Sequence, residues 1–143
     1  MDLQQISDRL EIQDVLIRYT RAVDTNSWDG LDTVFTPDAT IDYTETGGIA
    51  GSYPEVKAWL AETLPAFFSA YMHTLGQVAI EYDDSGDGAD VTAYFDNPML
   101  MRAGEGEPTI VEVGGLYHHS MVRTPDGWRS KRLHEQLVWK RGI

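Results

Sequence analysis

The sequence predicts an α+β fold in which helices pack on one side of a curved, largely antiparallel sheet. Up to about residue 71, apolar residues recur at the three- and four-residue steps that are typical of amphipathic helices. From residue 74 onward the period changes to two, which is typical of strands with one buried face. Turn sequences rich in glycine, aspartate and proline divide this second part into long strands.

The first helix is expected over about residues 3–23, because apolar residues fall on one face there: Ile12, Val15, Leu16, Tyr19, Ala22 and Val23. A short second helix is expected within residues 26–35. Pro37 and Asp38 are then expected to form a turn into a brief strand over residues 39–45.

The third helix begins after Ser52, has Pro54 in its first turn, and is predicted to run to about Tyr71. Pro65 is expected to kink or split it. Four strands follow, over residues 74–83, 89–103, 109–124 and 127–140. With no repeat and no linker, we expect one domain over residues 1–143.

Composition limits the classes of partner. Eleven basic and 23 acidic residues give a formal charge of −12, and a negative field of this kind repels phosphate backbones and anionic lipid. We therefore expect no nucleic-acid and no membrane partner. The absence of cysteine excludes disulfides and thiolate nucleophiles. The polar, acidic N-terminal segment does not fit a signal peptide, so we expect a soluble, cytoplasmic protein.

Two side chains at predicted element ends are candidates for chemistry. Asp24 follows the apolar face of the first helix, and it could either cap the helix end or turn inward; the pattern does not decide between these. His73 lies where the third helix meets the first long strand. An imidazole among apolar residues is more often a satisfied core histidine than a catalyst, so the pattern alone favours a structural role.

The other histidines carry less information. His118 and His119 are neighbours on a predicted strand and must point to opposite faces of the sheet, so that one of them faces the helices. His134 opens the sequence HEQLV, which begins like the zinc-protease pattern H-E-x-x-H. Val138 stands where the second histidine is required, and the segment has the pattern of a strand, so this motif fails.

Several segments resemble the SnoaL-like branch of the nuclear transport factor 2-like superfamily: IQDVLIRYTRAVDTNSWDGLDTVFTPDATIDY, MHTLGQVAIE and GGLYHHSMVRTPDGWRSKR. The resemblance covers nearly the whole chain. It implies a cone, in which a strongly curved mixed β-sheet wraps the N-terminal helices around one deep, mostly apolar pocket.

Within that superfamily the motifs are most similar to those of scytalone dehydratase, bile acid 7α-dehydratase and hexachlorocyclohexane dehydrochlorinase. Those enzymes pair an aspartate after the first helix with a histidine at the start of the first long strand, and the matching positions are Asp24 and His73. Tyr19 and Tyr43 match tyrosines of the two dehydratases. Where scytalone dehydratase has a second histidine, this chain offers a methionine, while His118 falls near a polar pocket position of that enzyme.

The resemblance implies a dehydratase-like lyase or isomerase that needs no metal and no organic cofactor. Asp24 would orient His73, His73 would remove a proton next to a carbonyl, and Tyr19 and Tyr43 would donate hydrogen bonds to the substrate. The expected substrate is an apolar, polycyclic or aromatic small molecule. Its expected contacts are Phe68, Met72, Phe95, Met99, Met101, Leu116 and His118.

Three alternatives remain open at this point. The chain could be a polyketide cyclase like SnoaL, in which an aspartate is the base, or a non-catalytic module that binds a ligand or assembles with a partner. Asp24, His73 and His118 could also form a metal site.

Self-association into a trimer or dimer is also expected, because near-alternating apolar residues are predicted to lie on the outer face of the sheet. They are Val111, Val113, Tyr117, Met121, Leu137 and Trp139.

Overall fold

The computed structural model describes residues 1–142, and its first element is helix α1 (Leu3–Asp24). Asp2 caps this helix: its side chain accepts a hydrogen bond from the backbone N–H of Gln5, whose side-chain oxygen accepts one from the backbone N–H of Asp2. The apolar residues of the predicted inner face are all buried. The first predicted helix is therefore confirmed.

The region after α1 differs from the prediction in detail. A six-residue 3₁₀ helix, η1 (Trp28–Thr33), replaces the short second helix. Strand β1 (Phe35–Asp42) begins almost at once, so Pro37 and Asp38 lie inside the strand and form no turn before it. Proline is tolerated there because the pairing of β1 is irregular over this part of the strand, where the missing N–H breaks no regular ladder.

After a short 3₁₀ turn, η2 (Thr44–Thr46), and strand β2 (Ala50–Ser52), helix α2 covers Tyr53–Phe67. The predicted end at Tyr71 is wrong, because residues Phe68–Tyr71 form strand β3. Pro65 cannot donate the hydrogen bond that a continuing helix needs, and the aromatic residues after it suit a strand. No helix within residues 1–142 is long and apolar enough to cross a membrane.

The four predicted long strands are confirmed as β4 (Thr74–Tyr82), β5 (Gly88–Met101), β6 (Ile110–Thr124) and β7 (Gly127–Arg141). Across residues 1–142 the strand order is β2-β1-β7-β6-β5-β3, and β4 also pairs with β5. The sheet is mixed because β1 runs parallel to β7. β3 pairs with residues 99–101 of β5 and β4 pairs with residues 89–96, so the two residues between β3 and β4 lie beside residues 97–98 of this strand.

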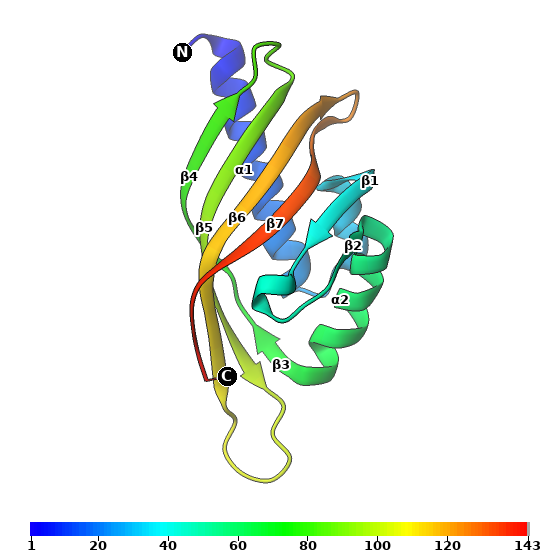
Figure 1. Ribbon diagram of the computed structural model, residues 1–143, viewed down its shortest axis with the longest axis vertical. Helices are drawn as coiled ribbons and strands as arrows, with labels where there is room; N and C mark the ends of the chain where they lie inside the picture. The colour runs from blue at the N-terminus through cyan, green and yellow to red at the C-terminus, as the bar shows by residue number, and fades with distance from the viewer. Residues whose placement is uncertain (143) are drawn as a thin grey trace.

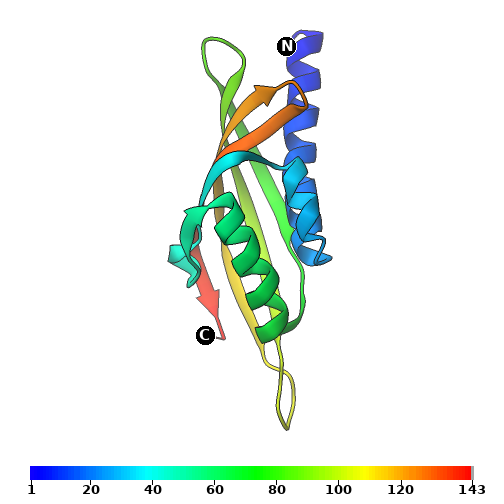
Figure 2. The same cartoon turned by 90° about the vertical axis from the view of Figure 1, so that its right-hand side faces the viewer.

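The helices and the sheet form the predicted cone. α1 lies behind the long strands in Figure 1 and beside them in Figure 2, so it covers one face of the curved sheet. α2 packs against β1 and β3, near the C-terminal end of α1. The register between β6 and β7 shifts at Gly114/Gly115 and at Ser120/Met121, where β7 carries one extra residue each time, and such bulges add to the curvature. The α+β architecture with a strongly curved mixed sheet is therefore confirmed.

The assignment of faces on β6 was wrong. Val111, Val113, Tyr117 and Met121 belong to the buried core, and none of them lies on the outer face of the sheet. Alternation separates two faces of a strand without stating which one is buried. Among the residues named for self-association, only Trp139 is exposed. Self-association therefore stays a prediction and loses the face on which it was based.

Candidate active site

Asp24 and His73 form a close pair although they are far apart in the sequence. The Nδ1 nitrogen of His73 lies 2.6 Å from one carboxylate oxygen of Asp24, and the backbone N–H of His73 donates to the other at 2.9 Å. The His73 side chain is 6% exposed and that of Asp24 is 19% exposed. Asp24 is thus turned inward as the last residue of its helix, and it is held by one partner on both oxygens.

The ends of two elements position this pair. α1 stops at Asp24, and the chain turns sharply at Asn26, whose φ of 55° lies in the left-handed region that asparagine tolerates. The hydroxyl of Tyr71, the last residue of β3, donates to the side-chain oxygen of Asn26. The backbone of Met72 then bonds to Pro98 on β5. These contacts fix the end of α1 against the segment that carries His73.

His73 opens onto a cavity of about 370 Å³ between the helices and the sheet. Most of its lining is apolar or aromatic, as in many small-molecule sites. The lining residues predicted from the sequence are Tyr19, Tyr43, Phe68, His73, Met99 and Met101. Further lining residues include Trp59, Leu64, Asn97, Val113 and Glu135. No lysine or arginine lines this cavity within the described part of the chain.

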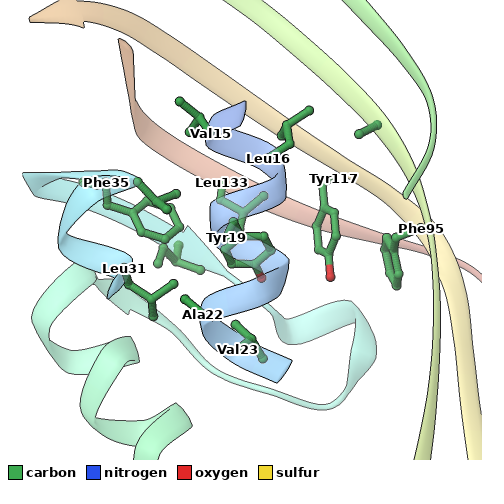
Figure 3. Packing of buried hydrophobic residues seen from close by; sticks show 14 of the residues in the cluster. Val15, Leu16, Tyr19, Ala22, Val23, Leu31, Phe35, Phe95, Tyr117 and Leu133 are labelled. Carbon is green, nitrogen blue, oxygen red and sulfur yellow. The ribbon is translucent and has the colours of Figure 1, made fainter. Parts of the chain in front are cut away.

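Tyr19 and Tyr43 share a short hydrogen bond in the cavity wall, with 2.5 Å between their hydroxyl oxygens. Both rings are buried, and burial raises the pKa of each phenol well above its usual value. Both hydroxyls therefore keep their protons at neutral pH and remain hydrogen-bond donors. Tyr117 packs edge-on against Tyr19, with ring centroids 5.2 Å apart, and Figure 3 shows the two rings side by side between α1 and the sheet.

Glu135, on β7, is a cavity residue that the sequence analysis missed. It is 7% exposed, and the hydroxyl of Thr46 hydrogen-bonds to its Oε1 oxygen. Burial raises the pKa of its carboxyl group above the usual value. A signal was present in the sequence, because Glu135 stands between Leu133 and Leu137 at the spacing of one strand face.

Four predicted contact residues do not line the cavity. Phe95 is buried and stacks on Tyr117, with ring centroids 4.2 Å apart. Met72 is 59% exposed, because it lies in the short connection before β4. Leu116 and His118 belong to the opposite face of β6, where His118 bonds to Gln136 at 2.7 Å. They were misplaced because the inward face of β6 carries the odd-numbered residues.

The same face assignment decides two open questions. His119, not His118, points toward the helices: it is 2% exposed, and its Nδ1 nitrogen lies 2.8 Å from the hydroxyl of Ser130. A metal site made of Asp24, His73 and His118 is wrong, because His118 lies on the other face of the sheet.

The pair suits proton transfer. A carboxylate that accepts from Nδ1–H fixes the tautomer in which Nε2 carries the lone pair. With Nδ1 engaged by Asp24 and the ring lining the cavity, Nε2 is the nitrogen left to meet a ligand. An imidazole held in this way has the geometry that a general base needs, and it lies in a mostly apolar cavity from which a ligand would exclude water.

Comparison with known proteins identifies relatives that are similar in sequence and solved structures that have the same fold. A protein of Mycobacterium tuberculosis without an assigned function is 45% identical over 141 residues, which cover 99% of this chain and 92% of that protein. A structure from Novosphingobium aromaticivorans, provisionally named an aromatic ring hydroxylase, is 30% identical with a TM-score of 0.84, covering 96% of this chain and 94% of that one.

Two more distant structures share the fold. A protein of N. aromaticivorans provisionally named a scytalone dehydratase has 19% identity and a TM-score of 0.82, covering 97% of this chain and 89% of that one. The type 3 hexachlorocyclohexane dehydrochlorinase of Novosphingobium barchaimii has 18% identity and a TM-score of 0.83, covering 100% and 97%. The fold is also shared with nuclear transport factor 2-like proteins. The model of the SnoaL-like domain matches residues 4–134, and this chain therefore belongs to the SnoaL-like domain family.

Proposed function

We propose that this protein is a lyase or isomerase that acts on an uncharged, apolar carbonyl compound without a metal or organic cofactor. The observation that carries the proposal is the pairing of Asp24 with His73 at the wall of a mostly apolar cavity. The structural neighbours of this chain include an enzyme named a dehydrochlorinase and a protein provisionally named a dehydratase. Elimination is the reaction that these two names have in common.

In the proposed reaction, Nε2 of His73 removes a proton from the carbon next to the substrate carbonyl. The resulting imidazolium is stabilised by Asp24, which accepts the hydrogen bond from Nδ1. Tyr19 and Tyr43 line the cavity as protonated phenols, and a phenol that donates to the carbonyl oxygen would stabilise the developing enolate. The substrate's own carbonyl activates the C–H bond, so no other electron sink is required.

The geometry favours this reaction over cyclisation with aspartate as the base. Both oxygens of Asp24 already accept hydrogen bonds from His73, and such contacts make a carboxylate a weaker base. A closed cavity, or side chains of Asp24 and His73 that point apart, would favour the non-catalytic alternative. The open cavity and the convergent pair therefore support the enzymatic proposal.

Dehydration of 3-hydroxy-1-tetralone tests the proposal. This neutral, bicyclic β-hydroxyketone loses water to give 1-naphthol, which is fluorescent. The wild type should catalyse the reaction, and His73→Gln should lower its rate about 10²- to 10⁴-fold, the usual contribution of a general base. His118→Gln is the matched control, because His118 lies outside the cavity, and it should keep wild-type activity. Equal rates for wild type and His73→Gln would overturn the assignment.

A further inference from the structure

Glu135 places a carboxyl group in the cavity that His73 lines, and it is the one carboxylic residue in the described lining. It comes from β7, whereas Asp24 and His73 come from the end of α1 and the start of β4. Within residues 1–142 Glu135 forms no ion pair, and no cation lines the cavity beside it except a protonated His73. A buried carboxylate without a partner is unfavourable, so the neutral acid is the form that this site accommodates.

The hydrogen bonds around Glu135 fit a carboxylic acid. Thr46 Oγ1 has two oxygen neighbours, Oε1 of Glu135 and the backbone carbonyl oxygen of Tyr43, but it carries only one hydrogen. The carbonyl can only accept. If Glu135 is protonated, it donates to Thr46 and Thr46 donates to the carbonyl, so that every hydrogen has an acceptor. If Glu135 is ionised, two acceptors compete for a single hydrogen.

The surroundings of Glu135 oppose one another, and burial is the strongest influence. Burial raises the pKa of Glu135, while polar contacts with the hydroxyls of Thr46 and Tyr117 and positive charges on His73 and His134 lower it, and the net shift is upward. The charge on His73 is absent while its imidazole is neutral. Before the proposed reaction, the imidazole of His73 is neutral and can accept a proton, and the carboxyl group of Glu135 is neutral and can donate one. Enzymes use pairs of an acid and a base in this way.

We propose that Glu135 is the proton donor of the site and protonates the oxygen that leaves the substrate while His73 removes the proton next to the carbonyl. The inference rests on the proposed function and names the acid that this function lacks. Tyr19 and Tyr43 are much weaker acids than a carboxyl group. They suit the carbonyl oxygen, which needs a hydrogen bond and not a full proton transfer.

The proposed step balances in atoms and charge. The C–H bond beside the carbonyl breaks and its proton passes to Nε2 of His73, while its electron pair forms the carbon–carbon double bond. The C–O bond breaks, and the leaving oxygen takes both electrons of that bond and the proton of Glu135, so water departs. The site is left as imidazolium and carboxylate, and transfer of one proton from His73 to Glu135 through solvent restores it.

Two probes separate the acid from the base. Hydrogen–deuterium exchange at the α-carbon of 1-tetralone in D₂O requires only proton abstraction, whereas dehydration of 3-hydroxy-1-tetralone also requires a leaving group. Glu135→Gln keeps the size of the side chain but removes the acid. We expect it to lower the dehydration rate about 10²-fold or more and to lower exchange much less. Glu81→Gln, an exposed glutamate on β4, is the matched control and should change neither rate.

An infrared measurement examines the same carboxyl group without a substrate. The spectrum of the wild type minus that of Glu135→Gln, in D₂O near neutral pH, should contain the C=O stretching band of a protonated carboxylic acid. The same subtraction with Glu81→Gln should contain carboxylate bands only. Thr46→Val should weaken or shift the acid band, because it removes the hydroxyl that contacts Glu135.

The outcomes keep the two proposals apart. If the wild type exchanges 1-tetralone but Glu135→Gln loses exchange and dehydration equally, the acid role is wrong and the base stands. The same conclusion follows if the wild type is active but the acid band is absent. If the wild type neither exchanges 1-tetralone nor dehydrates its hydroxylated analogue, the proposed function fails and the step assigned to Glu135 fails with it.

Discussion

Both carboxylate oxygens of Asp24 accept hydrogen bonds from one residue, His73, one from the ring and one from the backbone. The backbone bond fixes the position of the carboxylate, and the ring bond fixes the tautomer of the imidazole. An asparagine could satisfy only one of these donors, because its NH₂ group donates and does not accept. The pair is therefore sensitive to a change that leaves the shape of the side chain intact.

Asp24→Asn should lower the turnover of 3-hydroxy-1-tetralone about 10²- to 10⁴-fold, since the imidazole loses the partner that orients it. It should also lower the free energy of unfolding by about 1–3 kcal/mol, the usual effect of an unsatisfied buried group. Steady-state fluorescence and urea unfolding measure the two effects. Asp38→Asn, at an exposed position of β1, should change neither, and full turnover by Asp24→Asn would contradict the account.

The hydrogen bond between Tyr19 and Tyr43 predicts coupled effects on stability. Tyr19→Phe and Tyr43→Phe should each cost about 1–3 kcal/mol, because each leaves the other hydroxyl buried without that partner. The double variant should cost less than the sum, since both polar groups are then absent. Urea unfolding of the three variants measures the coupling, and strictly additive values would show that the two hydroxyls do not interact.

Met101 lines the cavity, so a larger side chain there should obstruct ligand entry. Met101→Trp is expected to weaken binding of 1-naphthol, measured by fluorescence titration, by about tenfold or more. Val138→Trp introduces the same side chain at an exposed position on β7 outside the cavity and should bind like the wild type. If Met101→Trp also bound normally, the ligand would have to occupy another part of the molecule.

His119 predicts a pH dependence of stability. Burial lowers its pKa from 6.5 to about 3 in the folded protein, whereas in the unfolded chain it regains its usual value. The unfolded state therefore binds more protons between these values, and the free energy of unfolding falls as the pH decreases from about 6.5 toward 3. His119→Asn should flatten this fall, measured by urea unfolding between about pH 6.5 and 4.5.

Ser130→Ala separates this titration from a simple loss of contacts. It removes the hydrogen bond at Nδ1 of His119 but keeps the buried imidazole. The variant should be less stable than the wild type at every pH and should retain the same slope. A flattened slope in Ser130→Ala, or an unchanged slope in His119→Asn, would count against the assignment of this pH dependence to His119.

The sequence predicted the elements better than their faces and ends. The three- and four-residue periodicity determined α1, and the period of two determined the four long strands, because each pattern reports burial along one element. The inward face of β6 was assigned wrongly, since alternation is unchanged when the two faces are exchanged. The end of α2 was placed too late because the aromatic residues after Pro65 suit a helix or a strand, and their pairing with β5 decided between them.

The residues of the candidate site were also predicted only in part. Asp24 and His73 are separated by 49 residues, so no local pattern could bring them together, and only the resemblance to a known family suggested the pair. Glu135 belongs to a segment whose alternation predicts a strand and whose HEQLV sequence fails as a metal motif, so no motif singled it out. A carboxylate between two leucines of one strand face indicates a buried acid, but its place in the chamber depends on the curvature of the whole sheet.

The most direct test of the proposed base is hydrogen–deuterium exchange at the α-carbon of 1-tetralone, followed by NMR in D₂O, because it requires neither a leaving group nor the natural substrate. We predict that the wild type and His118→Gln accelerate exchange to the same extent, and that His73→Gln reduces this acceleration about 10²- to 10⁴-fold. Exchange by His73→Gln at the wild-type rate would contradict the assignment of His73 as the base.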